Sequence, residues 1–222
     1  MTEPRTGSRG EILRRIRHAL DDVPAGETPE DSPVARDYLT VHADRTPGQS
    51  ARLLAEHLAD YRAHVHTTDD AGLPATIARL LGEHGSRTVT APPALPGAWL
   101  AQVTGVELVP GGGELTTQRL DAVDSVVTGC ALAIAETGTI VLDGSPDQGQ
   151  RRLTLVPDHH ICVIRAPEQI VDSVPQALPR LDAARPQTWI SGPSATSDIE
   201  LDRVEGVHGP RTLDVVIVTA AE

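Results

Sequence analysis

The spacing of apolar residues changes along the chain. In residues 9–21 they recur every three or four positions, so that Ile12, Leu13, Ile16 and Leu20 fall on one side of a helix and arginines occupy other positions. This pattern predicts an amphipathic helix that packs against a partner surface, either on the same chain or on another one.

The segment after this helix has a different composition. Residues 22–47 hold four prolines among acidic and small residues, which is typical of an extended linker. We therefore interpret residues 1–47 as an N-terminal extension and residues 48–222 as one domain. A chain of 222 residues is long enough for one sizeable core plus such an extension.

Helical and strand patterns alternate from residue 48 onward. Apolar stripes predict helices around residues 53–61 and 77–81, and short apolar runs that end at proline predict strands at residues 88–91 and 106–109. Later segments predict central strands at 130–135 and 139–142, strands at 161–165, 188–191 and 213–218, and a helix at 167–178. This order predicts a three-layer α/β/α fold with a largely parallel sheet.

Composition supports this fold class and excludes several functions. The chain has no Phe, 2 Tyr and 2 Trp, so small aliphatic residues must fill the core, as in strands covered by helices. Its net charge of -12 argues against affinity for nucleic acid or anionic membranes. All 19 basic residues are arginine, which excludes a lysine nucleophile or Schiff base.

The two cysteines do not form a metal-binding motif. Cys130 and Cys162 lie inside apolar runs and lack any C-x-x-C spacing, so we interpret them as buried thiols. The N-terminus has no apolar stretch of signal-peptide length, and no run reaches the roughly 20 residues of a membrane span. We therefore expect a cytoplasmic protein.

An acid interrupts the most apolar part of the chain. Glu136 follows the run 130–135 and precedes Thr137, Gly138 and Thr139. A carboxylate between an apolar strand and a glycine turn is either a structural acid held by hydrogen bonds or a catalytic group. Both interpretations stand at the level of sequence.

The loop after the predicted strand at 188–191 is rich in small and polar residues. These are Gly192, Pro193, Ser194, Thr196 and Asp198. Ligands of α/β folds collect at the carboxyl ends of strands, and the start of a following helix attracts carboxylate or phosphate. Ser194 or Thr196 would equally serve as a helix cap without any ligand.

Four further side chains and one glycine complete the candidate anion site. Arg151 and Arg152 follow a glycine-rich loop, and a guanidinium fork suits a carboxylate or phosphate, although adjacent arginines are often simply solvated. His160 precedes one predicted strand, and His208 with Gly209 precedes the last. A lone histidine is usually structural, so their shared position beside strands is what makes them candidates.

The sequence motifs of a metal site and of a catalytic triad are absent. The histidines, Glu136 and Asp198 have no paired metal-ligand spacing, so we predict no metal in this chain. A triad of Ser194, a histidine and Glu136 lacks the G-x-S-x-G turn.

Four separated stretches resemble the LUD domain of the lactate utilization protein C family. They are AIAETGTIVLDG, RRLTLVPDHHICVI, ISGPSATSDIE and GVHGPRTLDVVIV, and the resemblance covers about residue 48 onward. It implies the fold of class I CoA transferases, ribose-5-phosphate isomerase and glucosamine-6-phosphate deaminase. One departure is Ala195, where some relatives carry a basic or amide side chain, so an anion there would depend on backbone groups and arginines.

The resemblance also implies a function. It implies participation in bacterial oxidation of L-lactate to pyruvate, together with companion proteins that carry the iron–sulfur clusters, while this chain has no cofactor of its own. It implies an accessory subunit that binds a small carboxylate or other anion, and a homo-oligomer is compatible with it. The alternative is a stand-alone acyl- or CoA-transferase or isomerase, since CoA transferases place a nucleophilic glutamate near the position of Glu136.

Overall fold

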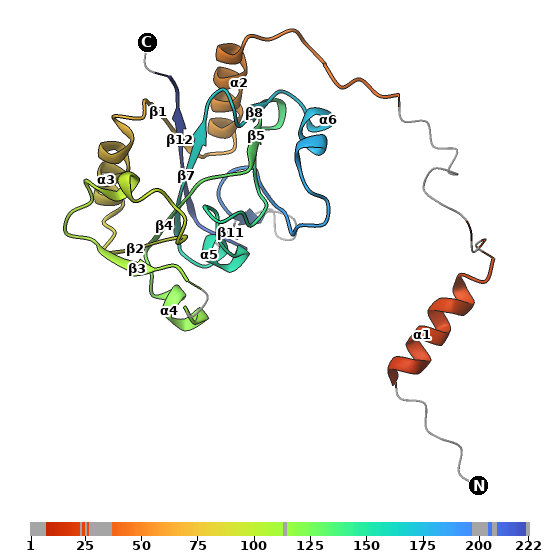
Figure 1. The fold of residues 1–222 in the computed structure, drawn as a ribbon. Helices are drawn as coiled ribbons and strands as arrows, with labels where there is room; N and C mark the ends of the chain where they lie inside the picture. Colours follow the sequence, from red (N-terminus) through yellow and green to blue (C-terminus); the bar gives the residue numbers. More distant parts are fainter. Residues whose placement is uncertain are drawn as a thin grey trace. The chain divides into compact units, whose positions relative to one another are not determined.

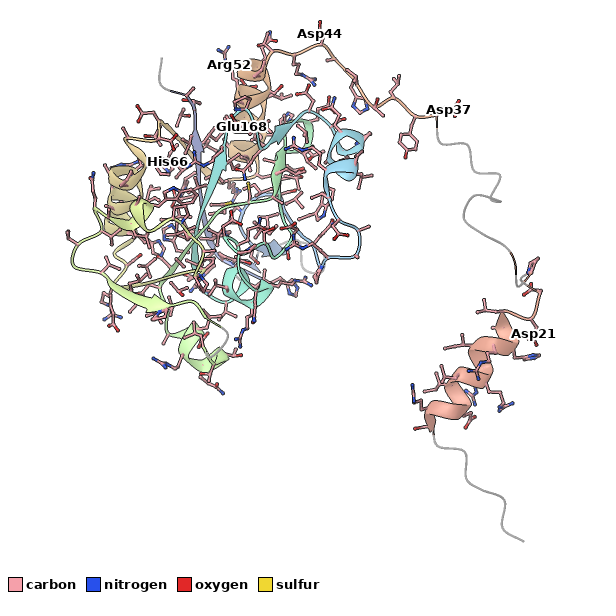
Figure 2. The ribbon with its side chains drawn as sticks, in the orientation of Figure 1. Asp21, Asp37, Asp44, Arg52, His66 and Glu168 are labelled. Carbon is pink, nitrogen blue, oxygen red and sulfur yellow. The ribbon has the colours of Figure 1, made fainter. Side chains whose placement is uncertain are left out.

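The computed structural model describes residues 8–22, 24, 26, 37–112, 115–196, 204–205 and 208–220. The chain divides into two compact units, Met1–Tyr38 and Leu39–Glu222, and each is considered by itself. In the first unit, α1 (Ser8–Ala19) confirms the predicted amphipathic helix. Its side chains project on all sides, with Asp21 just beyond its end (Figure 2), and none of its residues is buried.

A six-stranded parallel sheet forms the centre of the second unit (Figure 1). In spatial order its strands are β1 (His64–Thr68), β12 (Thr212–Val218), β7 (His159–Arg165), β4 (Ser125–Thr128), β2 (Thr88–Ala91) and β3 (Glu107–Pro110). Every neighbouring pair is parallel. With helices on both faces, the predicted three-layer α/β/α class is confirmed.

The two faces of this sheet bury alternate residues of the same strands. In β7, Ile161 and Val163 pack beneath α3 (Leu73–His84), whereas Cys162 and Ile164 pack toward α2 (Pro47–Asp60). This alternation is the two-residue period of a strand covered on both sides. No described helix is long and apolar enough to cross a membrane.

Local sequence signals define the ends of both covering helices. Thr46 caps α2 by accepting from the Gln49 N–H, and the Gln49 side chain accepts from the Thr46 N–H, which completes a capping box. Gly85, at φ 73°, ends α3 in the left-handed conformation that favours glycine. These signals set where α2 begins and where α3 ends.

A second sheet covers the α2 side of the parallel sheet. Its order is β8 (Ile170–Val171), β5 (Leu132–Ile134), β6 (Thr139–Leu142) and β9 (Thr188–Ile190). β5 pairs antiparallel with β6, and β6 antiparallel with β9. The prediction of strands at 130–135 and 139–142 is confirmed by β5 and β6, but their expected place in the central parallel sheet is wrong, because both lie in this second sheet.

The cause of that error is burial on both faces of the second sheet. Ala133 and Ile140 face the core beneath α2, while Leu132, Ile134 and Val141 face a separate apolar cluster on the far side. Such strands have the continuous apolar pattern of central parallel strands. The actual central strand β4, which is fully buried, was missed.

The predicted helix at residues 167–178 is also wrong. Ile170 and Val171 pair with β5 instead, and the carbonyl of Gln169 accepts from the Ala133 N–H at 2.7 Å. β-branched residues suit this strand edge. Only α6 (Val174–Ala177) is α-helical here, and it is followed by η4 (Leu178–Arg180).

The remaining elements are short. They are η2 (Gly97–Leu100), α4 (Thr117–Asp121), η3 (Ala135–Thr137), α5 (Arg151–Leu155), β10 (Ala195–Thr196) and β11 (Val204–Glu205). Cys130 and Cys162 are free and buried, as predicted. The hydrogen bond with Cys162 and burial raise the pKa of Cys130 well above its ordinary value.

Candidate functional site

Half of the predicted site residues line one cavity of about 300 Å³. They are Arg151, His160, Gly192, Pro193, Ser194, His208 and Gly209. The structure therefore brings together four segments that are far apart in the sequence. We name this space the small cavity.

Each segment reaches the small cavity from a defined element. Arg151 is the first residue of α5, His160 the second of β7, and residues 192–194 follow β9. Residues 208–210 lead into β12. Two hydrogen bonds join the last two segments: the Ser194 hydroxyl accepts from the His208 N–H at 3.0 Å, and the Ser194 N–H donates to the Pro210 carbonyl at 2.8 Å.

Gly192 fixes the loop after β9. Its φ of 83° lies in the left-handed region, and a Cβ there would meet the carbonyl oxygen of Tyr61 at the end of α2. Only glycine fits both the conformation and the close approach. The loop is therefore anchored against α2, with its other side toward the small cavity.

His160 is held as a neutral imidazole. Its Nε2 lies 2.8 Å from the Thr128 hydroxyl oxygen, and the residue is 1% exposed. Burial, with the nearby His159 as a smaller cause, lowers the pKa of His160 to about 3. At neutral pH it offers the small cavity a hydrogen-bonding group without charge.

The positive charge of the small cavity comes from Arg151. Its guanidinium has no hydrogen bond or ion pair with the described part of the chain, whereas Arg152 donates from Nε to Gln150 Oε1 at 3.1 Å and does not line the cavity. An arginine without a partner can bind a carboxylate through two parallel hydrogen bonds. Together with neutral His160 it suits a small acid that also carries a hydroxyl group.

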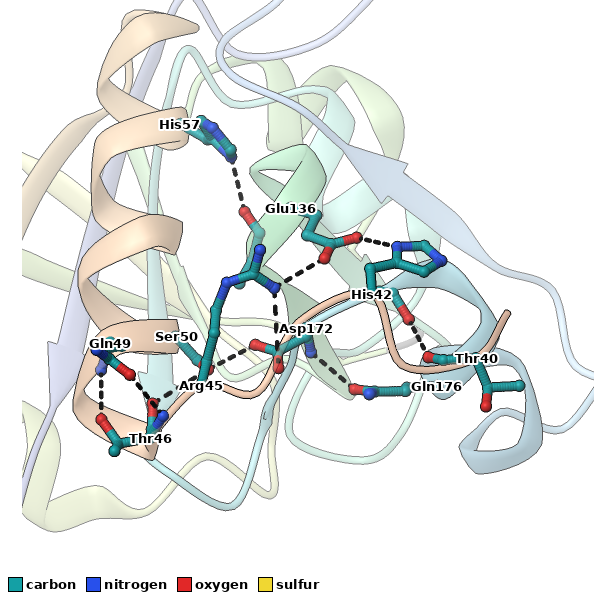
Figure 3. Close-up of polar contacts among 12 residues, drawn as sticks. Thr40, His42, Arg45, Thr46, Gln49, Ser50, His57, Glu136, Asp172 and Gln176 are labelled. Atoms are coloured by element: carbon teal, nitrogen blue, oxygen red, sulfur yellow. Dashed lines mark hydrogen bonds and ion pairs between the residues drawn. The ribbon is translucent and has the colours of Figure 1, made fainter. Parts of the chain in front are cut away.

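Glu136 lies elsewhere. Its carboxylate accepts from Arg45 Nη1 at 2.8 Å and lies 2.7 Å from His42 Nδ1 (Figure 3). Arg45 also lies 4.0 Å from Asp172, which accepts a hydrogen bond from the Ser50 hydroxyl. Glu136 does not line the small cavity.

The electrostatics of Glu136 favour the structural interpretation. Burial alone would raise the pKa of Glu136, but the hydrogen bonds from Arg45 and His42 outweigh it and hold that pKa below its usual value. The bond with Glu136 in turn raises the pKa of His42. The ionised carboxylate anchors residues 39–46 to the domain. Both of its oxygens are occupied by Arg45 and His42, and its lowered pKa is the opposite of the raised pKa that an apolar pocket would give a general base.

The residues after Glu136 have structural positions. Gly138 turns at φ 55° against His57 of α2. The Thr139 hydroxyl accepts a hydrogen bond from the Thr137 hydroxyl at 2.8 Å and lies 2.9 Å from the Ser191 hydroxyl. Asp198 and the side chain of Thr196 lie outside the described residues.

One detail of the predicted loop chemistry is wrong. Residues 195–196 form β10, paired antiparallel with β11, so no helix starts there to attract an anion or to be capped by Ser194. The small cavity adjoins the carboxyl end of β9, where residues 191–194 line it, and also the amino ends of β7 and β12, where His160 and Leu213 are the second residues of their strands.

The triad considered from the sequence is not assembled, because the Glu136 carboxylate pairs with Arg45 and His42 and does not line the cavity that Ser194 lines. A different Ser–His–Asp chain exists: Ser125 Oγ lies 2.8 Å from His159 Nδ1, and His159 Nε2 lies 2.8 Å from Asp214. Ser125 and His159 are fully buried, so this series of hydrogen bonds links β4, β7 and β12 inside the domain. It offers no exposed nucleophile. Among the described residues, no three His, Cys, Asp or Glu side chains group as metal ligands.

A larger cavity of about 640 Å³ was not predicted. It adjoins the carboxyl ends of β2 and β3 and shares Arg151, Thr154 and Thr188 with the small cavity. The glycines after residue 110 and Arg185 belong to no motif that marks them as residues of a cavity.

The fold and site define a class: an α/β domain with a parallel six-stranded sheet, a covering second sheet and a cavity lined by an arginine and a buried histidine. The LUD domain model matches residues 51–218. A lactate utilization protein C from Deinococcus radiodurans is 42% identical over 212 residues, 94% of each chain. One from Bacillus subtilis is 33% identical over 115 residues, which is 48% of this chain and 47% of that protein.

A solved structure has a similar fold. The crystal structure of a DUF162 family protein from Deinococcus radiodurans has a TM-score of 0.67 and 37% identity, covering 79% of this chain and 99% of that one. The chain belongs to the LUD domain family, and the predicted resemblance is confirmed.

Proposed function

We propose that this chain is the subunit without iron–sulfur clusters in a bacterial L-lactate utilization system, and that it binds a small carboxylate in the small cavity. Relatives named lactate utilization protein C support a role in lactate utilization. The main support for the carboxylate ligand is Arg151. This cation has no partner in the described chain and lines a cavity together with neutral His160.

The chemistry of an α-hydroxy acid matches these groups. The guanidinium of Arg151 binds the carboxylate, and His160 or the Ser194 hydroxyl bonds the hydroxyl group. The paired carboxylate of Glu136 gives no support to the alternative of a stand-alone transferase. We propose that electrons from lactate pass to clusters held by companion proteins.

Calorimetric titration with L-lactate and pyruvate tests the ligand. We expect saturable binding to the wild-type chain and at least about tenfold weaker binding for Arg151→Gln, the loss typical of one charged hydrogen-bonded contact. Arg152→Gln is the matched control, because it removes the same charge one position away from the cavity lining, and we expect its affinity within about twofold of wild type. Equal losses in both variants would contradict a specific role of Arg151.

The subunit role needs its own experiment. The tagged full chain is recovered from lactate-grown cells, and co-purifying proteins are identified by mass spectrometry and assayed for iron and acid-labile sulfide. We expect iron–sulfur proteins in stoichiometric amounts. Recovery of the chain alone under these conditions would contradict the subunit role without affecting the ligand proposal.

A further inference from the structure

The larger cavity exceeds the needs of a three-carbon acid. Its volume of about 640 Å³ is roughly twice that of the small cavity. Sites of about 300–1,000 Å³ hold ligands of cofactor or drug size. L-Lactate has only six non-hydrogen atoms and would leave most of this space unfilled.

The position of the larger cavity is typical of a ligand site. Pro93 and Ala94 follow the end of β2, and Gly111 and Gly112 follow the end of the adjacent parallel strand β3. Open α/β sheets bind ligands in the crevice at the carboxyl ends of such strands. The small cavity, at the amino ends of β7 and β12, does not occupy this crevice.

Its opposite wall is rigid. The buried Gln148 side chain accepts from the Asp143 N–H at 2.7 Å, and Arg185 donates to Asp143 at 2.9 Å and to the Ser145 hydroxyl at 3.1 Å. These bonds fix the loop between β6 and α5 from both sides. A wall held in this way resists collapse into the cavity, so the space is preformed.

The lining favours an anion with an apolar body. Its charged side chains are Arg151, Arg185 and Asp143, a net charge of +1 in a chain of net charge -12. Asp143 pairs with Arg185, which leaves the charge of Arg151. Prolines supply rigid apolar surface to the lining, since Pro93, Pro146 and Pro186 all contact the cavity.

We propose that the larger cavity is a second binding site, for an aromatic anion larger than the small carboxylate, whose charged group pairs with Arg151 and whose ring system lies against the prolines. This inference goes beyond the proposed function and does not require that lactate binds. Because both cavities share Arg151, the two ligands compete for its guanidinium.

The test uses 8-anilinonaphthalene-1-sulfonate, an aromatic sulfonate whose fluorescence rises in apolar sites, with the full chain. We expect saturable binding at one site. Ala94→Trp fills the cavity from an exposed position and should weaken binding at least tenfold, and Arg151→Gln should weaken it comparably. Ala98→Trp adds the same side chain at an exposed position outside the lining and should bind within twofold of wild type.

Unchanged binding in Ala94→Trp, or no saturable binding by wild type, would overturn the inference. Urea unfolding of each variant verifies that the fold is intact. Calorimetry of L-lactate with Ala94→Trp separates the two proposals: retained lactate binding with lost probe binding supports two sites. Lost lactate binding in that folded variant would overturn the assignment of separate sites.

Discussion

Arg45 donates a hydrogen bond of 2.8 Å to the carboxylate of Glu136, across 91 positions of sequence. The acid that interrupts the most apolar part of the chain is thereby neutralised by the segment that leads into α2. His42 contributes the second contact to the same carboxylate. This cluster stabilises the fold, and it does not line the small cavity. Glu136 should therefore affect stability but not ligand binding.

The first prediction is that replacing Glu136 changes stability but not ligand affinity. Glu136→Gln should lower the free energy of unfolding by about 1–3 kcal/mol, because the ion pairs of Arg45 and His42 with a carboxylate are replaced by weaker contacts with a neutral amide. Affinity for L-lactate should stay within twofold. Urea denaturation and calorimetry measure the two quantities, and Glu168→Gln, at an exposed position, is the control with an expected change below about 0.5 kcal/mol. A loss of lactate affinity in the folded variant would return Glu136 to the site.

The second prediction is a pH dependence of the His42 contact. The raised pKa of His42 means that its stabilisation is fully present below the ordinary value of 6.5 and is lost as pH rises through the raised value. The lowered pKa of Glu136 means that its stabilisation is present above 4.5 and is lost as pH falls through the lowered value.

Together these shifts give a window between pH 4.5 and 6.5 in which both groups are charged in the folded state. His42→Gln should therefore destabilise the chain more at pH 5.5 than at pH 8.5, as measured by urea unfolding at both values. Equal destabilisation at the two pH values would show that the imidazolium does not contribute.

The third prediction concerns His160. Its pKa of about 3 predicts that the ring resonances do not titrate between pH 8 and pH 4 in NMR spectra. In the unfolded chain the His160 ring binds a proton near pH 6.5, whereas in the folded chain it stays neutral until about pH 3. The stability that depends on neutral His160 is therefore lost as pH falls from 6.5 toward 3. If the His160 resonances of the folded protein titrate near pH 6.5, the His160 ring is solvated and the prediction is wrong.

A fourth prediction compares two glycines. Gly192→Ala should destabilise by about 1–3 kcal/mol and weaken lactate binding, because a Cβ at a φ of 83° strains the backbone and meets Tyr61. Gly82 lies inside α3 with open space around it, so Gly82→Ala should stabilise by up to about 1 kcal/mol. Thermal unfolding monitors both, and similar effects of the two substitutions would contradict the structural role of Gly192.

Parts of this structure followed directly from local pattern. The strand at 88–91 was predicted with its observed bounds, because prolines end it abruptly. The strands at 132–134 and 139–142 were predicted as strands but assigned to the wrong sheet, because strands of a small mixed sheet buried on both faces have the same composition as central parallel strands. Residues 167–178 failed for a related reason, since pairing of Ile170 and Val171 with β5 overrides local helical preference.

The site shows the same division. Separated motifs predicted Arg151, His160 and Ser194 as candidates, and the structure places them around one cavity. No local pattern marks His42 and Arg45 as partners of Glu136, because they lie in a stretch whose composition is that of a linker. The pairing depends on the long-range path of the chain, which spacing along the sequence does not encode.

The two sulfur atoms at the centre of the domain have a practical consequence. Cys130 is 1% exposed and Cys162 is 0% exposed, so a thiol-specific reagent reaches them only when the sheet opens. The rate of their modification then reports how often the native chain opens, and a ligand that slows opening slows the reaction. The two native cysteines therefore allow candidate ligands to be compared by their effect on this rate, without an engineered reporter residue.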